Sequence, residues 1–199
     1  RIKIIKSDTE LKSFPLWDMV VFAKACRTHG ATALNFSNTA PLGKTCGVAF
    51  IHDIYAKDFP NDFTSFRDKL VGAYCRFHYR NICKNARLVC TVSHFSKERI
   101  AKVYGVPEKR IAVIENGWEH FKEVQSDTGV FTRFPKLKNK NYYFTLGSLS
   151  KRKNLAWIAS HAAQYKDEVF AVSGKALSGL VPQEIESLKK LSNVVLLGY

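Results

Sequence analysis

The sequence lacks any apolar run long enough to span a bilayer, and its start shows no signal-peptide pattern. It has only five cysteines, an odd number with no C-x-x-C pair, which argues against a disulfide framework or a zinc site. We therefore predict a cytosolic protein, soluble or peripheral to a membrane, with reduced and buried thiols. The cysteines are Cys26, Cys46, Cys75, Cys83 and Cys90.

Acidic residues are also scarce, with 17 Asp and Glu against 31 Lys and Arg, and the net charge is +14. The excess is spread along the chain rather than held in a tail. Such a balance suggests a polyanionic partner, which could be nucleic acid, an anionic membrane or a phosphorylated small molecule. A basic surface that contacts only solvent is also compatible with this composition.

Short apolar runs alternate with helical patterns along the chain, and several runs are continuously apolar and rich in Val and Ile. Such runs are typical of strands that are buried on both faces. The predicted strands are 2–5, 32–36, 46–51, 87–92, 110–114, 142–146, 168–173 and 193–197. The predicted helices are 16–28, 65–86, 94–104, 154–165 and 182–191. This alternation predicts an α/β fold with parallel sheets.

The segment 118–141 breaks this rhythm, because it has no clear periodicity and carries Gly, Pro and scattered lysines. We interpret it as a linker between two α/β domains. The first domain then covers residues 1–117 and the second covers residues 142–199. The sequence opens as a strand already under way and closes as a strand just completed, so we expect both domains to be incomplete.

The predicted helix 65–86 carries a basic stripe, with an apolar face elsewhere on the helical wheel. The stripe consists of Lys69, Arg76, Arg80, Lys84 and the adjoining Arg87. The apolar face consists of Leu70, Val71, Tyr74, His78 and Ile82. Either the stripe is the solvated face of a packed helix, or it contacts an anionic surface.

Two strand ends in the first domain carry polar side chains at the edge where open α/β sheets bind ligands. His52 and Asp53 end the run FIHDIY, where a His can contact a sugar hydroxyl or a phosphate, transfer a proton, or simply bond the backbone. Ser93 ends the next strand and is a predicted N-cap, and Gly105 is predicted to end that helix. Glu115, Asn116 and Gly117 then follow a further strand.

The stretch TLGSLSKRKNL, residues 145–155, places a glycine and cations between a strand and a helix start. Gly147 allows a ligand to approach the backbone. Arg152 offers a planar fork for phosphate oxygens and Lys153 a point charge, while the helix start adds free N–H groups. This arrangement suits a diphosphate, and a solvated basic turn is the alternative.

The order and spacing of TVSHFSKERIAKVYGVPEKRIAVIENG, YYFTLGSLSKRKNL, VFAVSG and NVVLLGY resemble family-4-type retaining glycosyltransferases. The resemblance covers residue 40 to the end and implies the GT-B architecture of two Rossmann-like domains. It implies that Arg152 and Lys153 hold the donor diphosphate above Gly147, and that His52 lies near the transferred sugar. It also places Ser93, Asn116 and Gly174 around the donor, with Asn116 and Gly117 in a turn that is more structural.

The resemblance further implies a nucleoside-diphosphate-sugar donor, a saccharide or lipid-linked acceptor, and no tightly bound cofactor. The resemblance also implies that no metal is required, and the lack of a D-x-D pair in the sequence agrees with this. The family's two donor-binding glutamates have no match here, so we expect this chain alone to be inactive. Surface polysaccharide or glycolipid synthesis at the cytoplasmic face of the membrane is the implied setting.

Two other functions are compatible with the net charge. One is a basic nucleic-acid-binding protein, although the aromatic residues lie mostly in apolar runs and do not alternate with cations as a stacking platform would require. The other is a non-catalytic module that binds a membrane surface.

Overall fold

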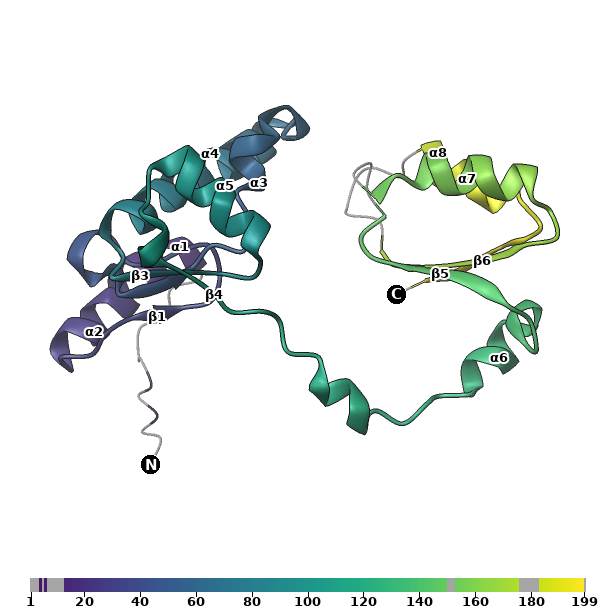
Figure 1. Ribbon diagram of the computed structural model, residues 1–199, viewed down its shortest axis with the longest axis horizontal. Helices are drawn as coiled ribbons and strands as arrows, with labels where there is room; N and C mark the ends of the chain where they lie inside the picture. The colour runs from purple at the N-terminus through teal and green to yellow at the C-terminus, as the bar shows by residue number, and fades with distance from the viewer. Residues whose placement is uncertain (1–3, 5, 7–12, 150–152, 176–182, 199) are drawn as a thin grey trace. The chain divides into compact units, whose positions relative to one another are not determined.

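The computed structural model describes residues 4, 6, 13–149, 153–175 and 183–198 (Figure 1). Contacts within the chain divide it into two compact units, Arg1–His120 and Phe121–Tyr199. The predicted first strand, 2–5, falls outside the described residues except for Ile4, which is exposed coil.

Unit 1 is built on four parallel strands in the order β1-β2-β3-β4. The strands are β1 (Leu34–Asn35), β2 (Val48–Phe50), β3 (Leu88–Thr91) and β4 (Ile111–Val113). The α-helices are α1 (Phe14–Leu16), α2 (Ala23–Thr28), α3 (Tyr55–Asp58), α4 (Phe66–Asn85) and α5 (His94–Tyr104). A π-helix (Trp17–Phe22) joins α1 to α2, and short 3-10 helices cover Gly43–Cys46, Pro60–Asp62 and Glu108–Arg110.

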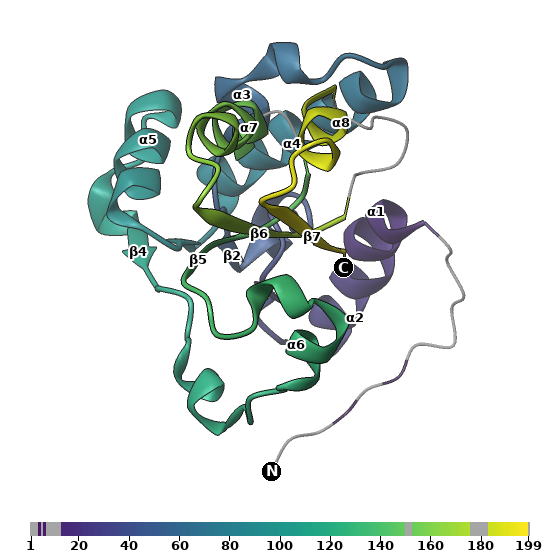
Figure 2. The ribbon, with the colours of Figure 1, turned by 90° about the vertical axis from the view of Figure 1, so that its right-hand side faces the viewer.

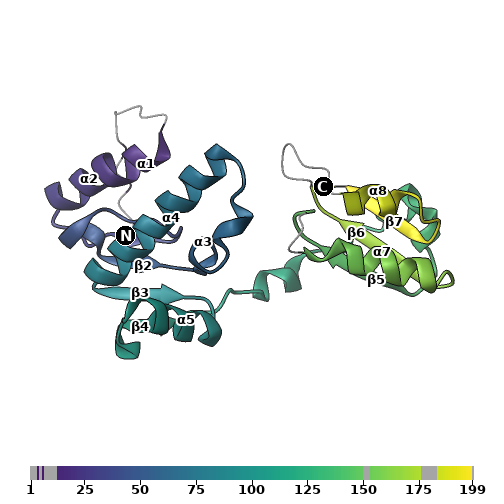
Figure 3. The ribbon, with the colours of Figure 1, turned by 90° about the horizontal axis from the view of Figure 1, so that it is seen from above.

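The core of unit 1 lies between this sheet and the helices α4 and α5, which Figure 1 shows on one side of it. Ile51, Ile82, Val89 and Ile100 are all fully buried there. Seen from above in Figure 3, α4 crosses this unit, and α3 packs against it. Apolar runs that read as strands buried on both faces therefore do form the interior of a parallel sheet.

Local sequence signals explain where the two long helices begin and end. Ser65 and Asp68 form a capping box at the start of α4. Ser93 is the N-cap of α5, where its side chain accepts a hydrogen bond from Ser96 N, and Gly105 ends that helix with a left-handed φ of 65°. The predictions for Ser93 and Gly105 as helix caps are confirmed.

The predicted faces of α4 need two corrections. Arg76 is not part of an exposed stripe, because it is half-buried and donates a hydrogen bond from Nη1 to Ala56 O over 3.0 Å. Leu70 and Val71 are not packed, since 56% and 49% of their surfaces are exposed. The reason is rotational: the buried side of α4 is centred near Tyr79 and Cys83, so the predicted apolar face lies only partly against the sheet.

The cysteines are free thiols, and four of the five are buried while Cys75 is half-buried. Burial raises the pKa of both Cys46 and Cys83 to about 12, with a nearby carboxylate, Asp18, adding to the rise at Cys46. These two groups are therefore protonated near neutral pH and serve as small apolar side chains. The prediction that the cysteines are buried is confirmed for all but Cys75.

Unit 2 is a three-stranded parallel sheet in the order β5-β6-β7. The strands are β5 (Tyr142–Leu146), β6 (Val169–Ser173) and β7 (Val194–Gly198). The helices are α6 (Gly129–Arg133), α7 (Leu155–Gln164) and α8 (Gln183–Lys189), with a 3-10 helix at Pro135–Leu137. Another 3-10 helix, Glu119–Glu123, includes the residues at which the two units divide. Figure 2 shows α7 and α8 side by side over one face of the sheet and α6 on the other.

Successive residues of β6 belong to the two faces in turn. Phe170 and Val172 pack with α7 and α8, whereas Ala171 packs with Leu137, which is 2% exposed. The segment 118–141, interpreted from sequence as a linker, therefore contributes its second half to the core of unit 2. Phe131, Phe134 and Leu137 recur at a spacing of three, which brings them to one side of the short helices.

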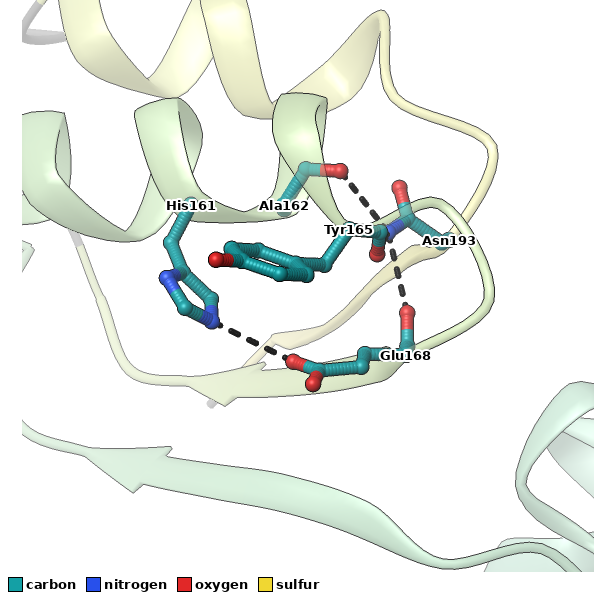
Figure 4. Close-up of polar contacts among 5 residues, drawn as sticks. All are labelled: His161, Ala162, Tyr165, Glu168 and Asn193. Carbon is teal, nitrogen blue, oxygen red and sulfur yellow. Dashed lines mark hydrogen bonds and ion pairs between the residues drawn. The ribbon is translucent and has the colours of Figure 1, made fainter.

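One buried amide joins three segments of unit 2, as Figure 4 shows. Asn193 is 9% exposed, and its Nδ2 donates to the carbonyl oxygens of Ala162, Tyr165 and Glu168 over 2.9, 3.0 and 2.9 Å. Two of these carbonyls lie at the carboxyl end of α7, where a helix leaves its last C=O groups without intrahelical partners. Asn193 thereby fixes the end of α7 to the start of β7.

We predict that Asn193→Ala lowers the free energy of unfolding of unit 2 by about 2–3 kcal/mol, because it removes a donor shared by three carbonyl oxygens, of which the contact with Ala162 O is buried. Asn193→Asp should cost more, since a carboxylate would face the same three oxygens. Urea unfolding measures both variants. Gln164→Ala, at an exposed position of α7, is the control and should change stability by less than about 0.5 kcal/mol. Equal stability of Asn193→Ala and this control would contradict the assignment.

Candidate functional site

His52 is held in place at the carboxyl edge of the unit 1 sheet by three hydrogen bonds. Its backbone N donates to Asn38 Oδ1 over 2.8 Å, and its backbone O accepts from Ser96 Oγ over 3.0 Å. Its ring Nε2 lies 2.6 Å from Phe36 O. The loop after β1, the end of β2 and the start of α5 thus meet at this one residue.

The contact with Phe36 O determines the tautomer of His52. A carbonyl oxygen can only accept, so Nε2 must carry the proton. In the neutral ring Nδ1 is then the nitrogen able to accept a proton or a hydrogen bond. The ring is half-buried and stacks on Phe50 at a centroid distance of 5.9 Å, which orients it without enclosing it.

Ser93 lies at the same edge as His52, but its hydroxyl serves the helix. It accepts from Ser96 N and is 3.1 Å from Ser96 Oγ, and Ser96 in turn bonds His52 O. Ser93 is thereby linked to His52 through Ser96. Asn116 and Gly117, which the resemblance places in a turn, lie in exposed coil after β4.

In unit 2, two strand ends approach each other so closely that only glycine fits. Gly147 follows β5 with φ 153°, and Gly174 follows β6 with φ 149°. A Cβ on Gly174 would lie 1.7 Å from Gly147 O, a distance no side chain can occupy. The backbone here is also tied by hydrogen bonds from Gly147 N to Ser173 O and from Gly174 N to Gly198 O.

The Lys153 side chain lies over this glycine edge. A Cβ built on Gly147 would meet Lys153 Cε at 3.1 Å and Nζ at 3.6 Å, so the ammonium group is beside the end of β5. The helix α7 begins two residues later, after Asn154 in the left-handed conformation with φ 51°. Arg152, the other predicted diphosphate ligand, lies outside the described residues.

This edge of unit 2 has the elements of an anion site. The Lys153 ammonium lies beside the backbone of Gly147, which has no side chain. The first N–H groups of the ten-residue helix α7 follow directly in the chain. Among the described residues no group of three His, Cys, Asp or Glu could hold a metal ion. In that same part of the chain no helix is long and apolar enough to cross a bilayer.

Sequence reasoning missed the residues that position the predicted ones. Asn38 has a left-handed φ of 43° and orients the His52 backbone, and Ser96 bonds the same residue from α5. Asparagine is enriched among the non-glycine residues that adopt a positive φ. Its presence in the run FSNT, residues 36–39, was therefore a signal that sequence analysis could have used. Ser96 carried no signal of its own, because a serine in the first turn of a helix is common.

Several solved structures share the fold of this chain. HepE of Anabaena, solved with UDP-glucose, matches with a TM-score of 0.60 at 20% identity, over 91% of this chain and 45% of HepE. A glycosyltransferase of Rickettsia africae matches with a TM-score of 0.58 at 14% identity, over 98% of this chain and 54% of that protein. Likenesses at such identities show the fold alone, and they confirm the predicted GT-B fold class.

Sequence comparison identifies the family. The O-antigen chain mannosyltransferase RfbU of Salmonella typhimurium is 28% identical over 130 residues, which are 65% of this chain and 30% of RfbU. This chain therefore spans less than a third of that curated relative and about half of the solved structures. The sequence profile of Glycosyltransferase Family 4 matches residues 13–120, more than half of the chain. The predicted resemblance is confirmed, and the chain belongs to Glycosyltransferase Family 4.

Proposed function

We propose that the complete protein transfers a sugar from a nucleoside-diphosphate-sugar donor to a saccharide or lipid-linked acceptor. The anomeric configuration is retained, and the reaction serves surface polysaccharide or glycolipid synthesis. The observation that carries the proposal is the Gly147–Gly174 edge with the Lys153 ammonium beside it. Family membership, the UDP-glucose complex of HepE and the mannosyltransferase activity named for RfbU support it.

The leaving group of such a transfer is a nucleoside diphosphate, which gains negative charge as the sugar departs. Lys153, with Arg152 next to it in sequence, supplies positive charge, and the start of α7 supplies N–H donors. The bare backbone at Gly147 and Gly174 lets phosphate oxygens approach it closely. In this proposal, cationic side chains stabilise the charge that a metal ion would otherwise stabilise.

His52 is proposed to contact the transferred sugar. With its proton on Nε2 and bonded to Phe36 O, the ring presents Nδ1 as an acceptor for a sugar hydroxyl. Its backbone is fixed by Asn38 and Ser96, so the ring position is set before a ligand binds. Ser93 and Asn116 are proposed around the donor as well, with Ser93 acting through the N-terminus of α5.

The proposal is tested by titrating the complete protein with a nucleoside diphosphate and its monophosphate. We expect the diphosphate to bind at least tenfold more tightly, because the proposed site holds the second phosphate. Lys153→Ala should weaken diphosphate binding and kcat/KM by about ten- to a hundredfold, since it removes a charged hydrogen bond. Arg152→Ala should do the same. Lys166→Ala, an exposed lysine beyond α7, is the control, and losses equal to the control would sink the assignment.

His52→Ala should lower kcat by about ten- to a hundredfold while the melting temperature changes little. His52→Gln is the informative partner, because its amide can still donate to Phe36 O while it lacks the ring Nδ1. If His52 acts on the sugar, both variants lose activity in steady-state assays. Full activity of His52→Gln would instead assign the ring a structural role.

Gly174→Ala should abolish detectable donor binding, because its Cβ would collide with Gly147 O. Gly198→Ala is the matched control: its φ of 79° is also unfavourable for alanine, but no atom lies within 4 Å of the added carbon. Calorimetric titration with a nucleoside diphosphate separates the collision from the backbone strain. Similar affinities of the two variants would show that the close approach is not part of the site.

A further inference from the structure

One asparagine of the chain is followed directly by a glycine. Of the ten asparagines in the sequence, only Asn116 has this neighbour, Gly117. Both residues are exposed, and they lie in the coil between β4 and the 3-10 helix Glu119–Glu123. The side-chain amide and the backbone nitrogen that follows it therefore belong to an exposed segment without the hydrogen bonds of a helix or strand.

An asparagine amide in such a segment can react with its own backbone, which makes asparagine a thermolabile residue. The backbone nitrogen of the next residue loses its proton and attacks the side-chain Cγ. A bond from this nitrogen to Cγ forms, and the bond from Cγ to Nδ2 breaks, so that Nδ2 takes up a proton and leaves as ammonia. Water then opens the resulting succinimide at either carbonyl and gives aspartate or isoaspartate. The reaction needs no oxidant, reductant or enzyme.

Gly117 presents the least hindered nitrogen for this attack, because glycine has no Cβ and its backbone rotates freely. A Cβ built at Gly117 would meet Glu119 Oε2 at 3.5 Å, which is an ordinary contact with a flexible side chain. Within the described part of the chain, Gly117 N donates no backbone hydrogen bond. The attacking nitrogen is thus neither crowded nor engaged.

Buried asparagines of the same protein lack these conditions. Asn35 is 7% exposed, and its Nδ2 donates to Cys46 O over 3.4 Å. Asn193 is 9% exposed and its amide is held by three carbonyl oxygens. The nitrogen that follows Asn193 is engaged as well, since Val194 N donates to Leu191 O over 3.2 Å. The fold therefore protects these amides and leaves the one before glycine unprotected.

We propose that Asn116 is a modification site at which the folded protein deamidates spontaneously through a succinimide. The reaction replaces a neutral amide by a carboxylate in the coil after β4. Opening to isoaspartate also adds a methylene group to the backbone there. The modification is independent of which donor or acceptor the protein uses.

The test is incubation of the complete protein in water enriched in the heavy oxygen isotope, followed by peptide mapping with mass spectrometry. We expect residue 116 to lose its amide and to gain one heavy oxygen, faster in mildly alkaline buffer because Gly117 N must lose its proton. Asn141 is exposed but precedes Tyr142, and it should react at least about tenfold more slowly. Gly117→Ala should slow the reaction at Asn116 by at least about tenfold for the same reason.

A synthetic peptide of residues 111–121 supplies the rate without the fold. We expect the folded protein to react within about tenfold of this peptide, since the segment has few contacts to hold it. An amide that survives in the folded protein long after the peptide has reacted would show that the fold holds the pair, and it would overturn the proposal. Equal rates at Asn116 and Asn141, or an unchanged rate in Gly117→Ala, would do the same.

Discussion

The contact of Gly147 O with the backbone of Gly174 is the constraint on which the candidate site of unit 2 depends. Parallel pairing aligns β5, β6 and β7 so that their carboxyl ends meet at one edge. A glycine directly follows β5 and β6, and a glycine is the last residue of β7. Because Gly174 has no Cβ, the chain after β6 can approach Gly147 O closely, and the Lys153 ammonium lies beside Gly147. Any side chain at Gly174 would push the edge apart.

In unit 1, side chains rather than glycine backbone determine the geometry of the carboxyl edge of the sheet. Its parallel strands also bring their carboxyl ends to one edge, but there a histidine is fixed by Asn38, Phe36 and Ser96 from three different segments. These contacts set both the position of the ring and the tautomer. The unit 2 edge therefore offers an ammonium group and N–H donors, whereas the unit 1 edge offers an acceptor nitrogen.

The sequence was enough to predict the parallel α/β fold, because continuous apolar runs have few other uses. It also located the caps at Ser93 and Gly105, where local chemistry decides the conformation. The residues alone did not decide between a structural role and a ligand-binding role for His52 and Lys153. Only the family resemblance favoured the ligand-binding role. The hydrogen bonds of Asn38 and Ser96 join residues 14 and 44 positions apart, and no local pattern encodes such pairings.

The two segments that the structure corrects have one physical cause, which is that local sequence does not show where the core lies relative to a segment. In residues 118–141 the missing knowledge was that a sheet lay close enough for Leu137 to pack on it. In α4 it was the rotation of the helix, which buries Tyr79 and turns Phe66 outward among lysines. Apolar and cationic residues that the sequence assigned to separate faces, such as Leu70 and Lys69, therefore share the exposed side of α4.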